Sequence, residues 1–310
     1  MLYCGREHQA ADRDKHKLSC NLVKKRRDLL EHEEQALRAH PGDIFQPADV
    51  FTTSVGHFWG ILGTRDYMRA RHSLVEAILK IKTFDAVKSA LDHIMDILRL
   101  NRGDNMGVRY MVPALLLRLD RDQECYDFVK WYATMGQDAH YDWGDMSLPF
   151  LNVVNANVFE PVDYMCGRWP NLSHTAGIAL LKIKLLLDLK SLQTSAVLGE
   201  KAPQEILSNI QIYLPRSTIV SESREIMDRT DHAAHIEELS LQVEELYTTV
   251  KRANKHFWPA LLKPDRHLKA RPPAYSHGSV EEMQLVLQYS IDSWIETPGA
   301  LEVIKAKGKV

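Results

Sequence analysis

Apolar residues recur at intervals of three and four along much of the chain, which is the spacing of one face of an α-helix. The clearest examples are residues 64–82 and 84–100, which only a short turn separates. The same pattern returns at 105–119 and 123–135. Because a short turn brings the second helix back along the first, these segments predict two antiparallel helix pairs.

Further amphipathic or leucine-rich segments flank the two pairs. They predict helices at residues 21–40, 147–158, 173–193, 203–214, 231–253, 279–294 and 298–305. Two stretches without this pattern, 195–203 and 217–231, predict a linker and a polar, mobile segment. The predicted fold class is therefore all-α.

Paired helices joined by short turns resemble the stacking of tetratricopeptide-like proteins. The segment 98–110, reading LRLNRGDNMGVRY, is similar to the link between consecutive repeats of that group. In such a link Asp104 or Asn105 would cap the next helix. The strict repeat consensus is not met, so the resemblance is to a tetratricopeptide-like helical repeat array, over about the middle third of the chain.

The predicted helix pairs imply which of their positions are in the core and which are on the surface. The positions expected in the core are Leu74, Ile94, Leu98 and Leu115. Replacing one of these leucines or the isoleucine with alanine should cost about 2–5 kcal/mol. Arg102 lies in the link between repeats, and we expect it to tolerate alanine within about 0.5 kcal/mol.

Four side chains near the N-terminus form a Cys-x3-His-x7-His-x3-Cys pattern: Cys4, His8, His16 and Cys20. Thiolate sulfur and imidazole nitrogen are the ligands of structural zinc, which takes a closed tetrahedron of four protein atoms. Within each outer pair the spacing of four residues puts both side chains on one face of a helical turn. The intervening residues are too polar to form a core, so this segment would depend on the metal to fold. We therefore expect these residues to bind one structural Zn²⁺.

The same stretch resembles the C-terminal half of a MYND zinc finger. That half runs Tyr-Cys, three residues, Cys-Gln, an acidic residue, an aromatic residue, His-Lys, two residues and Cys. The positions in register here are Tyr3, Cys4, Gln9, Asp12, His16, Lys17 and Cys20. As a whole, finger and helices resemble fungal proteins with a MYND finger ahead of a helical repeat domain. MYND fingers generally bind short proline-containing peptides, so the resemblance implies protein partners.

The resemblance departs from the family pattern in two positions and at its front. His8 stands where the family usually has cysteine, and a histidine still serves as a zinc ligand. Arg13 stands where the family usually has tryptophan, which removes apolar cover from the finger. The first half of the family's finger, with its own zinc, would lie upstream of Tyr3. The expected finger is therefore a partial one.

Composition limits the class of protein rather than naming a function. The 310-residue chain is 45% hydrophobic and 26% charged, with a net charge of -2, which is typical of a soluble globular protein. This balance gives no general attraction to nucleic acid, and no apolar run is long enough to span a membrane. The remaining cysteines, Cys125 and Cys166, have aromatic or apolar neighbours and predict buried thiols. Without a disulfide framework or a signal peptide, a cytoplasmic or nuclear location is expected.

The sequence contains no motif that assembles an active site. A Gly-rich phosphate loop, a Gly-x-Ser-x-Gly elbow and a His-Glu-x-x-His pair are all missing. Some MYND fingers occur in SET-domain methyltransferases, but the helical pattern and the lack of an Asn-His-Ser-Cys stretch disfavour even a remnant of that enzyme. His140, Asp142 and Asp145 invite a metal interpretation, yet such residues commonly cap loops. We expect a protein without enzymatic activity.

The sequence thus divides into a partial finger at 1–20, a connecting helix at 21–42, a tetratricopeptide-like domain at 43–195 and a helical extension at 196–310. Finger and helical surface both indicate an adaptor that binds other proteins. The basic run Lys24 to Arg27 supports an alternative, a transcriptional regulator associated with nucleic acid. Acidic residues follow within about a turn, so a solvated helix face is the simpler interpretation of this run.

Overall fold

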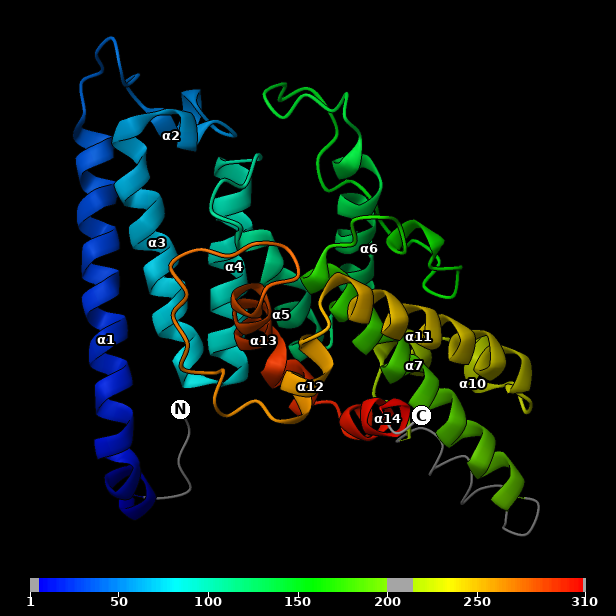
Figure 1. The fold of residues 1–310 in the computed structure, drawn as a ribbon. Helices are drawn as coiled ribbons and strands as arrows, with labels where there is room; N and C mark the ends of the chain where they lie inside the picture. The colour runs from blue at the N-terminus through cyan, green and yellow to red at the C-terminus, as the bar shows by residue number, and fades with distance from the viewer. Residues whose placement is uncertain (1–5, 200–213, 309–310) are drawn as a thin grey trace. The chain divides into compact units, whose positions relative to one another are not determined.

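The computed structural model describes residues 6–199 and 214–308, without the side chains of 6–16 and 196–199. Within these ranges all regular secondary structure is helical, and the one strand-like pairing is an isolated bridge between His57 and Asn101. The predicted all-α class is confirmed (Figure 1).

The chain forms two compact units, and neither is contiguous in sequence. The first comprises Met1–Arg109 and Asp142–Phe150, and the second Tyr110–Tyr141 and Leu151–Val310. The expected segments group differently: the finger, the connecting helix and the first helix pair all belong to the first unit. The second helix pair belongs with the C-terminal helices in the second unit.

The first unit is built on α1 (Arg6–Ala39), α3 (Arg65–Ile78) and α4 (Phe84–Leu100). These lie side by side, α1 against α3 and α3 against α4 (Figure 1). Val23, Leu30 and Leu37 of α1 recur every seven residues and are buried, which gives α1 a narrow apolar stripe. The shorter elements of the unit are α2 (Val50–Thr53) and single 3₁₀ turns at Phe58–Gly60, Leu62–Thr64, Leu79–Ile81 and Val108–Tyr110.

The helix predicted at 84–100 is confirmed to the residue. Thr83 is its N-cap, and the Thr83 side chain accepts a hydrogen bond from the Ala86 amide, as expected for a hydroxyl at this position. The predicted core residues of both helix pairs are also confirmed, since all are at most 2% exposed: Leu74, Ile94, Leu98 and Leu115.

Arg102 contradicts the expectation of a tolerant surface position. Its guanidinium donates hydrogen bonds to the backbone oxygens of Asp145, Met146 and Leu148 and lies 5.1 Å from the Phe150 ring centroid. Arg102 therefore attaches the 142–150 loop to the rest of the first unit. Sequence spacing alone gave no sign of a partner more than forty residues away.

We expect Leu98→Ala to lower the free energy of unfolding by about 2–5 kcal/mol, because truncation leaves a cavity in the core. Arg102→Ala should lower it by about 1–3 kcal/mol, because several carbonyls lose a charged donor. Urea denaturation measures both. Arg99→Ala is the matched control, since the Arg99 side chain is 54% exposed and its ion pair with Asp96 should contribute under about 0.5 kcal/mol. Equal midpoints for the Arg99 and Arg102 variants would contradict the role of Arg102.

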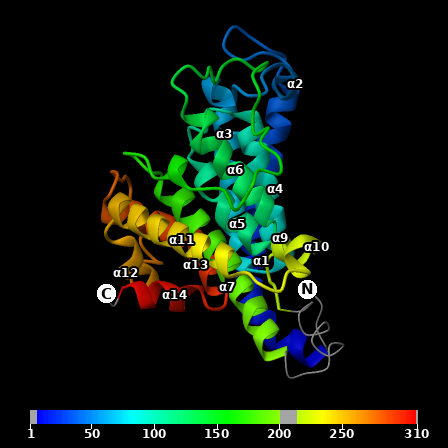
Figure 2. The ribbon, with the colours of Figure 1, turned by 90° about the vertical axis from the view of Figure 1, so that its right-hand side faces the viewer.

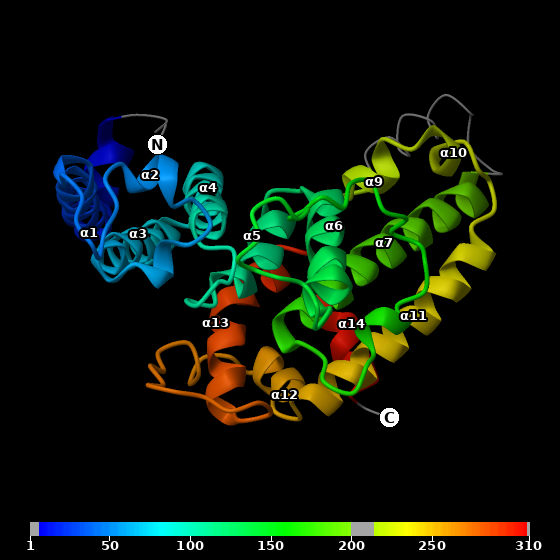
Figure 3. The same ribbon diagram turned by 90° about the horizontal axis from the view of Figure 1, so that it is seen from above.

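The second unit is organised around α7 (Leu172–Gly199), which is buried on nearly all sides from Leu172 to Leu189. Most side chains in this stretch are apolar, which suits an interior helix, and the charged Lys182, Lys184 and Asp188 are buried with them. The helix contacts neighbours along its length, with α11 (Ala233–Ala253) running beside it (Figures 2 and 3). The other helices of the unit are α5 (Val112–Arg118), α6 (Asp122–Ala133), α9 (Thr218–Ser221), α10 (Arg224–Met227), α12 (Phe257–Leu262), α13 (Val280–Ile295) and α14 (Ala300–Lys307).

The helix predicted at 147–158 is absent from the structure. Leu151 and Asn155 have φ values of 50° and 55°, which a right-handed helix does not allow. The Asp127 carboxylate instead accepts hydrogen bonds from the amides of Asn155 and Ala156 at 2.8 and 2.9 Å. A carboxylate on α6 therefore fixes this segment as a loop, which local periodicity does not reveal.

Other predicted boundaries also shift. The helix predicted from 105 begins as α5 only at Val112, with Pro113 in its first turn. Helix α7 continues through most of the expected linker, and the polar segment 217–231 contains α9 and α10. The helix predicted at 203–214 lies almost wholly outside the described residues.

Candidate functional site

The residues of the predicted zinc site are only partly described. Cys4 lies outside the described residues, and the backbones of His8 and His16 belong to α1 while their side chains are not described. Cys20 is on the same helix with an exposed side chain. The helix continues without a break past residue 20 into the segment predicted to connect the finger to the helical domain.

This continuous helix sets a condition on zinc binding. His16 and Cys20 are four residues apart and share a face of α1. The helical rise separates His8 from His16 by about 12 Å along the axis, which is too far for both to bind one ion. A single ion held by all four residues therefore requires a bend in α1 between His8 and His16.

Other sequence candidates have local explanations. The Asp142 and Asp145 carboxylates accept hydrogen bonds from the amides of Gly144 and Ser147, as expected for capped loops. Among the described side chains, no three His, Cys, Asp or Glu lie close enough to hold a metal ion. In the basic run of α1, Lys24, Lys25 and Arg27 are exposed, Arg26 is half-buried and the acidic Asp28 follows directly.

The remaining cysteines are covered to different extents. Cys125 is fully buried, as predicted, and Cys166 is only half-buried. Burial raises the pKa of Cys166 to about 11. The Cys166 thiol is therefore protonated at neutral pH, which makes it a poor nucleophile.

Two large apolar side chains project into solvent from the loop between α1 and α2. Ile44 is 90% exposed and Phe45 is 80% exposed. The Asp43 carboxylate accepts hydrogen bonds from the amides of Phe45 and Gln46 at 2.7 and 2.8 Å, and these bonds lower the pKa of Asp43. The loop backbone is therefore fixed while its apolar side chains face water.

A third exposed apolar residue belongs to the same region. The Gln46 side chain is buried directly beside Gly63, where a Cβ atom would meet the Gln46 oxygen. This contact places Leu62, which is 73% exposed, next to the loop. We name Ile44, Phe45 and Leu62 the apolar patch. The carboxylates of Asp43 and Asp49, in the same segment as Ile44 and Phe45, are exposed.

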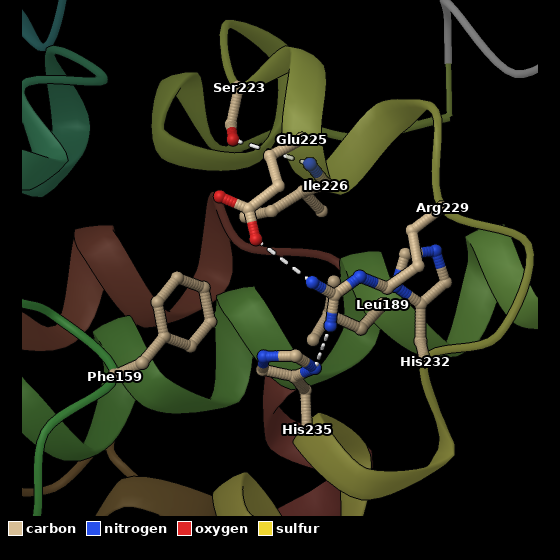
Figure 4. Close-up of a pocket in the computed structure, with 8 residues that line it drawn as sticks. All are labelled: Phe159, Leu189, Ser223, Glu225, Ile226, Arg229, His232 and His235. Atoms are coloured by element: carbon tan, nitrogen blue, oxygen red, sulfur yellow. Dashed lines mark hydrogen bonds and ion pairs between the residues drawn. The ribbon is translucent and has the colours of Figure 1, made fainter.

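A pocket of about 200 Å³ lies within the second unit (Figure 4). Leu189 of α7, Ile226 of α10 and Phe159 of a loop supply its apolar walls. Its polar lining consists of Ser223, Glu225, Arg229, His232 and His235. Three helices and two loops therefore converge on one small cavity.

Arg229 links two of the polar side chains. One guanidinium nitrogen lies 2.9 Å from the Glu225 carboxylate, and another lies 3.1 Å from Nδ1 of His235 (Figure 4). His232 is buried, its amide donates to the Gln193 side chain, and burial lowers the pKa of its imidazole. His232 is therefore neutral at pH 7, and the formal charges of Arg229 and Glu225 balance.

The Phe159 wall is fixed by a fully buried lysine. The Lys182 ammonium donates hydrogen bonds to the backbone oxygens of Val158 and Glu160 and to the Gln242 side chain. The amide nitrogen of Gln242 in turn donates to the Phe159 oxygen at 3.0 Å. Three successive carbonyls are thus held by two side chains, and the Phe159 ring keeps its place beside the pocket.

A scan of protein-family models, a search of curated proteins and a search of solved structures each found no match. No helix in the described part of the chain is both long and apolar enough to cross a bilayer.

Neither the apolar patch nor the pocket was predicted from the sequence. The pocket residues come from positions between Phe159 and His235 that only the packing of α7, α10 and α11 brings together. The patch had a weak signal, because Ile44 and Phe45 directly follow an aspartate in a Pro- and Gly-containing segment. That arrangement is typical of a turn, where apolar side chains lack neighbours to cover them.

Proposed function

We propose that this protein is an interaction adaptor that binds another protein through the apolar patch. The observation that carries the proposal is the exposure of Ile44, Phe45 and Leu62 on a backbone fixed by Asp43. Exposed apolar side chains that gather on one surface mark interaction sites. Aromatic and aliphatic anchors of this kind supply most of the binding energy in protein interfaces.

A protein partner is favoured over a lipid surface by charge. Membrane-binding loops combine apolar side chains with basic residues that attract anionic lipids. The segment that carries Ile44 and Phe45 instead contains the exposed carboxylates of Asp43 and Asp49, with the His40 imidazole 3.6 Å from the Asp43 carboxylate. Exposed carboxylates in this segment suit a partner with basic side chains around an apolar groove.

Two further features belong to the proposal. The helix pair α3/α4 of the first unit and the helix pair α5/α6 of the second would each supply a tetratricopeptide-like surface, with α5 shorter than the other three helices. The N-terminal segment would hold Zn²⁺ through Cys4, His8, His16 and Cys20 and add a MYND-type contact to proline-containing peptides. The continuity of α1 requires that zinc binding bend the helix in that segment.

We expect one zinc ion per chain by atomic emission spectrometry, and Cys20→Ser should remove it. Because four ligands close on one ion only if α1 bends between His8 and His16, adding zinc to the metal-free protein should slightly reduce the helical circular dichroism signal. The Cys20→Ser protein should show no such change. Equal zinc content in wild type and Cys20→Ser would contradict the site.

The adaptor proposal is tested by placing a photo-crosslinking amino acid at position 45 in living cells. Position 84 is the matched control, since Phe84 is also an exposed phenylalanine of the first unit. We expect a discrete protein to be crosslinked from position 45 and not from position 84. Ile44→Asp should abolish that crosslink.

The captured protein is then purified and titrated against the wild-type chain. We expect Phe45→Ala to weaken binding at least about tenfold, as for a buried anchor. Ile44→Asp should weaken binding to a similar extent, while Phe84→Ala should leave it unchanged. The proposal would be overturned in favour of a lipid surface by two results together: the wild-type chain sediments with anionic vesicles while Phe45→Ala does not, and no protein is crosslinked from position 45.

A further inference from the structure

We propose that residues 271–276, in the loop between α12 and α13, bind a protein domain whose groove is lined by paired aromatic side chains, the type of groove found in WW domains. The segment reads Arg-Pro-Pro-Ala-Tyr-Ser. It is a second interaction surface, on the second unit, and shares no residue with the apolar patch of the first unit.

The loop is fixed on both sides of this segment. Before it, the Gln288 side chain donates a hydrogen bond to the backbone oxygen of Ala270 at 3.1 Å. After it, the Glu282 carboxylate accepts from the Gly278 amide at 2.7 Å. Gln288 and Glu282 both belong to α13. The segment 271–276 is therefore presented between two fixed points beside this helix (Figure 1).

The segment is open to solvent. Pro273 and Ala274 are exposed, Pro272 is half-buried, and Tyr275 is 47% exposed. Helix α12 ends at Leu262 and α13 begins only at Val280, so the segment lies outside both helices. A partner can reach the proline and tyrosine rings without unfolding any helix.

The two prolines restrict the backbone to the conformation that such grooves bind. A proline ring fixes φ at about −65°, and a residue that precedes proline is restricted to extended conformations. Arg271 and Pro272 therefore favour the polyproline II helix, which has three residues per turn. Pro272 and Tyr275 are three residues apart. A polyproline II helix that continues through Tyr275 puts both side chains on one face.

The unbound segment needs one adjustment to present that face. Its backbone bends at Pro273. Because the proline ring fixes φ, the bend depends mainly on ψ of Pro273 and on the torsions of Ala274. Binding therefore orders few torsions, which keeps its entropic cost low.

The spacing distinguishes between the grooves that bind polyproline II helices. SH3 domains recognise Pro-x-x-Pro, in which two prolines are three residues apart. Here the residue three positions after Pro272 is Tyr275, and the residue three positions after Pro273 is Ser276. Tyrosine has a flat apolar ring and a polar hydroxyl. The segment therefore fits a WW groove that holds a proline pair in one slot and a tyrosine ring in the next.

Charged side chains beside the prolines indicate the rim of the partner's groove. The exposed cations between α12 and the prolines are Lys263, Arg266, Lys269 and Arg271, against one exposed carboxylate, Asp265. Opposite charges across an interface favour association, and like charges oppose it. The partner expected is therefore a WW-type groove with carboxylates on its rim.

The same cations would also attract a polyanion such as single-stranded DNA or an anionic membrane. A polyanion would bind through Lys269 and Arg271, whereas two proline rings offer it neither charge nor an aromatic surface. The neutral Pro-Pro-Ala-Tyr centre of the segment therefore favours a protein groove. Single-stranded DNA and anionic vesicles are included in the test as competing partners.

The proposal is tested by isothermal titration calorimetry of the full-length protein with purified domains. The probes are a WW domain that binds Pro-Pro-x-Tyr ligands and has an acidic rim, the same domain with its rim carboxylates replaced by lysine, and an SH3 domain. We expect the acidic WW domain to bind with one copy per chain. The basic-rim domain should bind at least about tenfold more weakly at low salt, and the SH3 domain should not bind.

Variants assign the binding to the segment. Tyr275→Ala and the double variant Pro272→Ala/Pro273→Ala should each weaken WW binding at least about tenfold, as for buried anchors. Trp169→Ala and Pro161→Ala are the matched controls, because both residues are exposed, belong to the second unit and lie in the chain before α7. The controls should bind as wild type does.

Circular dichroism verifies that each variant is folded. The tyrosine variant and the proline variant alter different residues, so either one decides the outcome if the other fails to fold.

Three results would overturn the proposal. The first is an acidic WW domain that does not bind the wild-type chain, and the second is loop variants that bind it as tightly as their controls. The third is binding of single-stranded DNA or anionic vesicles that is lost in Lys269→Glu/Arg271→Glu and kept in Tyr275→Ala, without WW binding.

The outcome is separable from the adaptor test at position 45. Ile44→Asp should leave WW binding unchanged, and Tyr275→Ala should leave the crosslink from position 45 unchanged, because the two surfaces belong to different units.

Discussion

Lys184→Met is expected to lower the free energy of unfolding by about 3–5 kcal/mol at pH 7, among the largest effects of any single substitution in this chain. The Lys184 ammonium lies 2.8 Å from Asp120 and 2.9 Å from Asp122. The Asp122 side chain is 0% exposed, whereas that of Asp120 is 62% exposed. Removing the cation therefore leaves a buried carboxylate without its main compensating charge.

The stability lost in Lys184→Met should depend on pH in a defined direction. Burial already raises the pKa of Asp122, opposed by Lys184, and removal of Lys184 raises it further. A carboxyl group whose pKa is raised by folding is best tolerated at acid pH, where it is protonated. Stability is then lost as the pH rises through the folded-state pKa. The difference in unfolding free energy between wild type and Lys184→Met should thus be smaller near pH 4 than at pH 7.

Guanidinium denaturation at both pH values measures this deficit. Lys190→Met is the matched control, since Lys190 is an exposed lysine of the same helix, and it should cost under about 0.5 kcal/mol. Asp120→Asn should also cost little, because its carboxylate is largely solvated. Equal costs for Lys184→Met and Lys190→Met would show that the pair does not stabilise the fold.

The second large effect concerns Lys182, whose side chain is completely buried. Burial lowers the pKa of Lys182 to about 7, opposed by the nearby Glu160 carboxylate. The unfolded chain therefore binds more protons at this residue than the folded chain between pH 7 and its ordinary pKa of 10.5. Stability must rise with pH over that interval, by up to about 1.4 kcal/mol per pH unit.

The difference in unfolding free energy between wild type and Lys182→Met isolates this contribution, because other titrating groups cancel. We expect the difference to change in favour of wild type by on the order of 3–4 kcal/mol from pH 7 to pH 10. The corresponding difference for Lys190→Met should stay flat. A flat difference for Lys182→Met would mean that the hydrogen bonds to Val158, Glu160 and Gln242 keep the amine protonated throughout.

Helices whose limits are marked by local features of the sequence, a capping residue and apolar residues at helical spacing, were predictable. The 84–100 helix has a β-hydroxyl cap at Thr83 and apolar residues at helical spacing, so its limits follow from local chemistry. Asp104 or Asn105 was predicted to cap the next helix, but the Asp104 carboxylate accepts from the amides of Val108 and Arg109 in a 3₁₀ turn, and α5 begins only at Val112 without a side-chain cap. The burial of Leu98 and Leu115 follows from their place in the periodic pattern.

Features that depend on distant partners were not predictable. Asp127 on α6 prevents the helix expected at 147–158, and Arg102 binds a loop more than forty residues downstream. Both effects are hydrogen bonds between segments whose proximity is decided by packing. The pocket is of the same kind, because Phe159, Leu189 and His235 become neighbours only when α7 and α11 pack. Periodicity identifies which face of a helix is buried, but not which helix covers it.

The division of the sequence between the units has a consequence for synthesis on the ribosome. The first unit needs Asp142–Phe150, held by Arg102, while Tyr110–Tyr141 belongs to the second unit. The first unit is therefore incomplete until residue 150 has left the exit tunnel, by which time α5 and α6 have emerged without α7. Folding of a nascent chain, which usually completes one domain before the next begins, must here proceed with both units open at once. A truncation after Arg109 should accordingly yield a chain more sensitive to proteases than the same residues in the full-length protein.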